Sequence, residues 1–135
     1  MPEFSSHDLA RCRLEKSADM LISAKRDLAA CDYASANNRA YYCIFHAMRA
    51  VLALDNIDFK KHSAVISAFN QRYVKTEEFE RAYSVLITTA SLIRTRSDYE
   101  DFYLCSKEDT VQLTRGAEQF HNSVAKYLMD TLNKE

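Results

Sequence analysis

The near absence of glycine and proline limits what this chain can fold into more than any other feature. Its 135 residues include one glycine, Gly116, and one proline, Pro2. Hairpins and short βα turns depend on these residues for their special dihedrals, so a sheet protein is disfavoured. Walker and dinucleotide-binding loops are excluded, because they need glycines where backbone approaches phosphate. We therefore expect an all-α fold.

Apolar residues recur at helical spacing in five stretches with short polar breaks between them. The expected helices cover about residues 6–30, 32–54 and 60–73, and two more begin at Thr76 and Ser106. Asp32 and Thr76 are the expected N-caps of the second and fourth helices. Short connections favour antiparallel neighbours, so we predict a compact up-down bundle of four to five helices. The length fits one domain over residues 1–135.

Charge and cysteine content restrict the partners. The formal net charge is −1, which gives no overall support for nucleic-acid binding, although a local arginine cluster could still provide it. The four cysteines form no CxxC pair, so we predict no metal site and no other cofactor. No apolar run approaches the roughly 20 residues of a membrane span, and no signal peptide is recognisable. We expect a cytoplasmic protein with reduced thiols and no membrane association.

The second predicted helix carries three stripes at helical spacing. The first has small side chains that let another helix approach closely: Ala36, Ala40, Cys43, Ala47 and Ala50. The second is bulky and apolar: Tyr41, Ile44, Phe45, Met48 and Leu52. The third is polar: Arg39, Tyr42, His46 and Arg49. A helix with two apolar faces should be central, so its polar face would border a groove. An ordinary solvated face is the alternative.

The residue types of this polar stripe favour an anion site. Arginine offers a planar fork of donors that suits phosphate or carboxylate. Histidine exchanges protons near neutral pH.

Two later segments supply further candidates. His62 lies on the apolar stripe of the third helix, and the helix dipole at its N-terminus should keep the ring neutral. Its alternative role is a capping or rim histidine. Arg94 adjoins the apolar stripe of the fourth helix and should face a neighbouring helix, with Asp98 at pairing distance along the helix. Alternatively, Arg94 is part of a charge cluster at the C-terminus of this helix, where the helix dipole favours positive charge.

Three stretches together resemble the HEPN superfamily, specifically its small stand-alone bacterial and archaeal members. They are NRAYYCIFHA at 38–47, KHSAVI at 61–66 and RTRSDY at 94–99, and the resemblance covers about residues 10–130. It implies an all-α bundle that usually forms homodimers. Many HEPN proteins are metal-independent ribonucleases, often toxins of toxin–antitoxin or other defence systems. Many are encoded beside a small nucleotidyltransferase that is their partner or antitoxin, and others are non-catalytic binding modules.

One departure from the family pattern bears on activity. Catalytic HEPN proteins typically carry an arginine followed four to six residues later by a histidine. Arg94 matches the motif arginine, whereas Tyr99 stands where that histidine would be. The missing residue is the one that would transfer protons.

These observations lead to two hypotheses for the function, each of a different class. In the first, which we favour, the chain is a binding and regulatory module for nucleotide or RNA phosphate, acting as a homodimer with a nucleotidyltransferase partner. Its ligand-binding candidates are Arg39, Tyr42, Asn38, His62 and Asp98. In the second, it is a ribonuclease toxin with a variant active site, and the catalytic candidates are Arg94, His46 and Tyr99. In a third interpretation, these groups lie in the bundle interior with their hydrogen bonds satisfied, and they form no functional site.

The same sequence offers material for homodimer formation. The small-residue stripe and the aromatic pair Phe102 and Tyr103 could form a contact between two copies. Alternatively, the aromatic pair plugs the end of the bundle.

Overall fold

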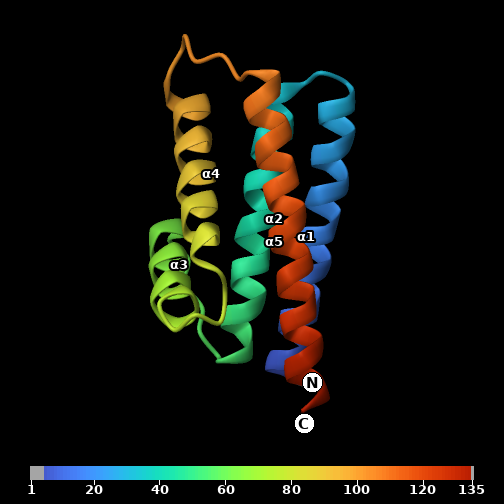
Figure 1. Ribbon diagram of the computed structural model, residues 1–135, viewed down its shortest axis with the longest axis vertical. Helices are drawn as coiled ribbons and strands as arrows, with labels where there is room; N and C mark the ends of the chain where they lie inside the picture. Colours follow the sequence, from blue (N-terminus) through green and yellow to red (C-terminus); the bar gives the residue numbers. More distant parts are fainter. Residues whose placement is uncertain (1–4, 135) are drawn as a thin grey trace.

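The computed structural model describes residues 5–134, which form five α-helices and one π-helical turn. The elements are α1 (Ser6–Ala29), α2 (Tyr33–Leu54), α3 (His62–Phe69), η1 (Asn70–Val74), α4 (Arg81–Tyr99) and α5 (Lys107–Asn133). Helices α1, α2, α4 and α5 run alternately up and down, and α3 with η1 forms the connection between α2 and α4 (Figure 1). No strand occurs in this range. The predicted all-α, up-down bundle is confirmed.

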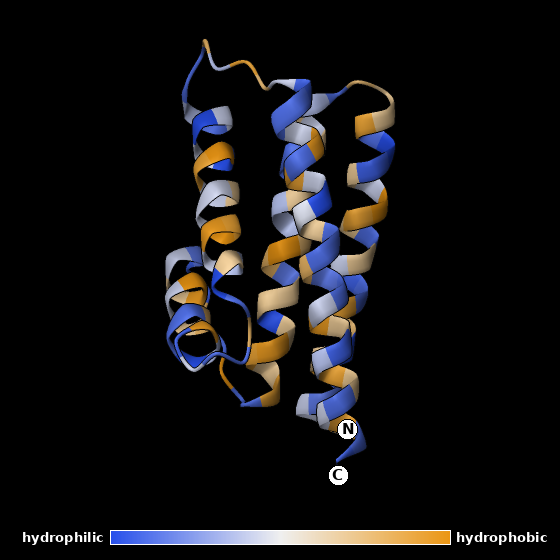
Figure 2. Ribbon diagram, in the orientation of Figure 1, coloured by the Kyte–Doolittle hydropathy of each residue, from blue (hydrophilic) through white to orange (hydrophobic). Residues whose placement is uncertain are grey.

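Helix α2 is central, as its two apolar stripes predicted. It packs against α1, α3, α4 and α5, and both stripes are buried. In Figure 2, α5 presents mostly hydrophilic residues to the viewer, while α2 behind it carries hydrophobic ones. Burial of apolar area on two faces is what holds a helix at the middle of a bundle.

The small-residue stripe does not serve as a surface for a second copy. All five of its side chains are fully buried within the chain, where α1 packs closely on α2. The Ser17 hydroxyl of α1 donates to the Cys43 carbonyl oxygen at 2.8 Å. The stripe therefore mediates close helix packing, as its small volume suggested, but the proposed intermolecular use is wrong because no part of it is accessible.

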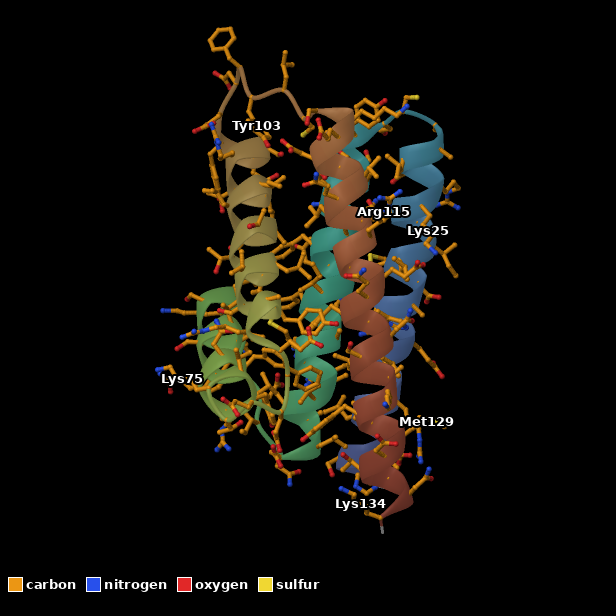
Figure 3. All side chains as sticks on the ribbon, in the orientation of Figure 1. Lys25, Lys75, Tyr103, Arg115, Met129 and Lys134 are labelled. Atoms are coloured by element: carbon orange, nitrogen blue, oxygen red, sulfur yellow. The ribbon has the colours of Figure 1, made fainter. Side chains whose placement is uncertain are left out.

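The aromatic pair in the α4–α5 connection does not fill the bundle end as a unit. Phe102 is 96% exposed. Tyr103 packs against the bundle near the end of α4 (Figure 3), with the Arg96 guanidinium 4.9 Å from its ring centroid. A bundle plug is thus wrong for Phe102, and Phe102 alone stays available for contact with another molecule.

The ends of α1 and α2 are set by local backbone chemistry. Asp32 caps α2 as predicted, and its carboxylate accepts from the Ser35 N–H. Cys31 after α1 and Asn56 after α2 both have positive φ, 62° and 59°. In each case the amide of this residue and the amide of the next residue donate to carbonyls of the last turn, which is a Schellman motif. Because the helices end at these residues, the connections between them are short and neighbouring helices are antiparallel.

The predicted start of α4 is wrong. Thr76 does not cap that helix; its hydroxyl donates to the Arg72 carbonyl at 2.7 Å and closes η1. Glu80 is the N-cap, and α4 begins at Arg81. The reason lies in Phe79, which is buried in the core beside Phe69 at a centroid distance of 5.3 Å. Burying that ring from a loop outweighs the local preference for a helix.

Candidate functional site

His62 lies where α2, α3 and α4 meet. It is the first residue of α3, and its ring stacks on Phe45 of α2 with centroids 4.1 Å apart and an interplanar angle of 23°. The Tyr41 hydroxyl lies 2.7 Å from Nδ1 of His62. Stacking on one side and a hydrogen bond at the edge fix the orientation of the imidazole.

Arg94 of α4 completes this centre. Its Nη1 lies 3.3 Å from Nδ1 of His62. Its guanidinium carbon lies 4.9 Å from the Tyr41 ring centroid and 5.6 Å from the Tyr42 centroid, within the range of cation–π attraction. The Nε of Arg94 is buried without a hydrogen-bond partner, and it lies 3.9 Å from the Asp98 carboxylate. The guanidinium is therefore held in place while one of its donors remains unused.

The contact with Arg94 defines the tautomer of His62. A guanidinium can only donate, so Nδ1 must accept from it, and the Tyr41 hydroxyl donates to the same nitrogen. The proton of the neutral ring then resides on Nε2, which points away from both donors. Nε2–H of His62 is thus left as a donor for another group.

Both histidines of the site are neutral near pH 7. Burial, and then the positive charges of Arg94 and Arg49, lower the pKa of His62. Burial, and then Lys16 and Arg49, lower the pKa of His46 to about 4. The neutral His62 expected from the sequence agrees with this direction, although burial and the arginines are the causes here.

A second group of charges lies beside the first and includes residues from α1. Arg13 is only 6% exposed; its Nη1 donates to the Arg49 carbonyl at 3.2 Å, and its Nη2 lies 3.2 Å from Oδ1 of Asp58. The Nη2 of Arg49 lies 2.8 Å from the same oxygen. Arg49 also lies over Phe45, with its guanidinium carbon 5.8 Å from the ring centroid. Since Phe45 stacks on His62, the two groups are neighbours.

Sequence reasoning missed Arg13 and Asp58, and it treated Tyr41 only as core. One signal for Arg13 was available. It shares its helix face with buried Ala10, Ser17, Leu21 and Ala24 of α1. An arginine on an otherwise small and apolar face must find a buried partner. Asp58 gave no such signal, because it lies in a connection and reaches Arg13 only in the folded chain.

The polar stripe of α2 is only partly drawn into the site. Tyr42 and His46 are half-buried with ring centroids 6.1 Å apart, and Tyr42 lies edge-on to His62 at 5.9 Å. Arg39 is exposed and donates to Oδ1 of its neighbour Asn38 at 2.8 Å. The structure thus brings Tyr42 and His46 to the centre and leaves Arg39 and Asn38 at the surface.

Tyr99 does not enter the site through its side chain. It is 83% exposed at the last turn of α4. Residues four apart share a helix face, so Asp98 lies on the same face of α4 as Arg94. A residue five positions after Arg94 is turned away from that face by about 140°. In this structure the Tyr99 side chain is therefore turned away from Arg94 and into solvent.

A groove of about 600 Å³ runs between α3 and α4 beside this centre. His62 and Arg94 line it together with five serine or threonine side chains and the apolar Ile66 and Leu92. Two of the hydroxyls, of Thr88 and Thr95, donate to carbonyls of their own helix, so the lining offers a ligand one cation and three serine hydroxyls as neutral donors. An anion with several acceptor oxygens, such as phosphate, matches these groups.

Within residues 5–134, no three His, Cys, Asp or Glu side chains are grouped so that they could hold a metal ion. No helix in that range is long and apolar enough to cross a membrane.

Comparisons with known proteins agree with the resemblance seen in the sequence. The HEPN domain model matches residues 10–127. A UPF0332 protein of Thermotoga maritima is 31% identical over 96 residues, which cover 71% of this chain and 73% of that protein. Two Methanocaldococcus jannaschii proteins named "Putative toxin" are 33% identical over 100 residues, covering 74% of each chain, and 30% identical over 118 residues, covering 87% and 80%. Because the family model spans most of its length, this chain belongs to the HEPN domain family.

Proposed function

We propose that this protein binds phosphate groups of RNA or a nucleotide at the His62–Arg94 centre. One observation carries the proposal. The Arg94 guanidinium is held over two tyrosine rings, 3.3 Å from a neutral histidine, at the edge of a groove lined with hydroxyl groups. Fixing a cation in advance lowers the entropy lost on binding, and its planar donors suit phosphate oxygens.

The neighbouring groups add to the same preference. Nε2–H of His62 is available as a neutral donor. Arg49 lies over Phe45, on which His62 stacks, and Arg13 lies beside Arg49 at the Asp58 carboxylate. The chain as a whole is close to neutral. Binding would therefore come from this local cluster and not from a general basic surface.

We infer that the protein acts in a toxin–antitoxin or defence system. Two relatives of similar length carry the name "Putative toxin". We expect a nucleotidyltransferase protein as its partner and the cytoplasm as its location. We also expect a homodimer. Leu92, which lines the groove, and Val85, two helical turns before it on α4, are exposed and would be the apolar surface that a second copy covers.

The binding proposal is tested with purified protein and a fluorescently labelled 12-nucleotide RNA, read by anisotropy. Arg94→Ala should weaken binding by about tenfold or more, the usual consequence of removing a charge-assisted contact of 1.5–3 kcal/mol. Arg96→Ala is the matched control, because Arg96 lies on the same helix and pairs with Glu100 at the surface. Equal effects of the two variants would indicate non-specific attraction and would sink the proposal.

A metal-independent ribonuclease with a variant site is the second candidate, favoured by the direct contact of His62 with Arg94. Acid–base catalysis at neutral pH needs a group that titrates near that pH, whereas the pKa of His46 lies at about 4 and Tyr99 faces solvent. Binding without cleavage fits these groups better. RNA cleavage by wild type that disappears in both Arg94→Ala and His46→Ala would reverse this ranking.

A further inference from the structure

We propose that Arg13 and Arg49 form a second anion subsite, which the Asp58 carboxylate occupies in the free protein and gives up to a phosphate group of the ligand. The proposal rests on the proposed function for the identity of the natural ligand. It adds that the ligand carries at least two phosphate groups, as an oligonucleotide does, one for Arg94 and one for this subsite.

Positive charges outnumber negative ones in this group. Two guanidinium groups share a single carboxylate, and both of their contacts are to the same oxygen, Oδ1 of Asp58, at 3.2 and 2.8 Å. Lys16 adds further positive charge, since it contributes to lowering the pKa of His46. A phosphate group could give each arginine its own oxygen, which one shared carboxylate oxygen does not do.

The same group has hydrogen-bonding capacity that is not used. The Nε of Arg49 and the Nδ1 of His46 are buried without a hydrogen-bond partner. Arg13 is almost completely buried, and an ion in that position requires good compensation. Arg49 thus has a buried donor left over, which a further acceptor such as a phosphate oxygen would satisfy.

Asp58 can move away from the two arginines without disturbing the fold. Its side chain is 57% exposed, and it lies between α2 and α3, outside any helix. Moving it would break no helical hydrogen bond. By contrast, Arg13 and Arg49 are fixed on long helices, and the hydrogen bond from Arg13 to the Arg49 carbonyl holds them together.

The two subsites are close enough for one ligand. Arg94 and Arg49 both contribute to lowering the pKa of His62, so the imidazole lies within the field of each guanidinium. Phe45 contacts both His62 and Arg49. A ligand that bridges the His62 ring would therefore meet both arginines.

The first test is calorimetric titration of the full chain with AMP and with the 5′-phosphorylated diadenylate pApA. Asp58→Asn should tighten pApA binding by roughly twofold to fivefold, the range for losing a competing partly exposed ion pair. Glu100→Gln is the matched control, because it removes the same charge from another arginine–carboxylate pair. Arg49→Gln should reduce the advantage of pApA over AMP.

The second test does not depend on nucleotide binding. Carbon-13 NMR of the full chain follows the Asp58 carboxyl with and without saturating inorganic phosphate. The two arginines hold the pKa of Asp58 below its usual range in the free protein, so displacement by phosphate should raise the pKa.

The outcomes separate the two proposals. If pApA binds but Asp58→Asn behaves as Glu100→Gln does and phosphate leaves the Asp58 pKa unchanged, the second subsite is wrong and the proposed function stands. If phosphate raises the Asp58 pKa while neither AMP, pApA nor RNA binds, the subsite is supported and the proposed function is lost. No response to any probe overturns both.

Discussion

The Tyr41 hydroxyl and Nδ1 of His62 lie 2.7 Å apart, and this contact joins the core of the bundle to its site. Tyr41 is 2% exposed and packs in the centre of α2, whereas His62 lines an open groove. A core residue thus hydrogen-bonds the nitrogen of the groove histidine that Arg94 keeps unprotonated. Stability and binding are coupled at this point.

Tyr41→Phe should therefore affect both the stability of the fold and binding at the site. The ring stacking would survive, but the hydrogen bond to His62 would be lost, and we expect a loss of about 1 kcal/mol in the free energy of unfolding. Urea denaturation followed by circular dichroism measures it. Tyr99→Phe is the control, because Tyr99 is 83% exposed and should change stability by less than about 0.5 kcal/mol. Equal stabilities of the two variants would contradict the hydrogen bond.

His46 should make the fold less stable in mild acid. Its folded-state pKa of about 4 lies below the ordinary value of 6.5, so the unfolded chain binds the proton more readily. The contribution of neutral His46 to the free energy of unfolding is complete above pH 6.5 and is lost as the pH falls towards 4. We expect about 1–2 kcal/mol from this residue, after allowing for its partial exposure to solvent.

The comparison of wild type with His46→Gln isolates that contribution. Unfolding free energies are measured between pH 7 and pH 4, and the variant should show the smaller loss over that interval. Carboxyl groups titrate alike in both proteins and cancel in the difference. Parallel pH profiles would show that the pKa of His46 is not depressed in the folded chain.

Cys31→Gly should stabilise the protein. Cys31 adopts a φ of 62° at the end of α1, a left-handed conformation that strains an ordinary side chain. After the greater flexibility of glycine in the unfolded chain is subtracted, we expect a gain of about 0.5–1 kcal/mol. Thermal melting under reducing conditions measures it.

The same substitution elsewhere on α1 provides the control. Cys12 is exposed in the helix interior, so Cys12→Gly should lower stability by about 0.3 kcal/mol through lost helix propensity. Opposite signs for the two variants identify backbone conformation as the cause. Destabilisation by both would show that the left-handed turn is not strained.

Much of the fold could be predicted from local patterns. The scarcity of glycine and proline and the two apolar stripes of α2 are properties of neighbouring residues, and they gave the all-α class and the central helix. The start of α4 could not be predicted in this way. There Phe79 is drawn into the core by Phe69 and Phe120, which lie far from it or on another helix.

The same distinction between local patterns and contacts made by distant segments holds for the site. The polar stripe of α2 and the approach of Arg94 to a neighbouring helix follow from helical spacing within one segment. The meeting of Arg13 with Asp58 joins α1 to a connection 45 residues later, and it arises only when the helices pack. Tyr99 was placed in the site by its motif position, whereas the helical phase turns it to solvent.

The most direct test of the central claim is nitrogen-15 NMR of the histidine rings during titration with the 12-nucleotide RNA. Binding at the His62–Arg94 centre predicts a saturable shift of Nε2 of His62, with Nδ1 still behaving as an acceptor. His121, which bonds to Ser17 on α1, should keep its signals unchanged and acts as the internal reference. Saturating RNA binding with an unchanged His62 would contradict the account.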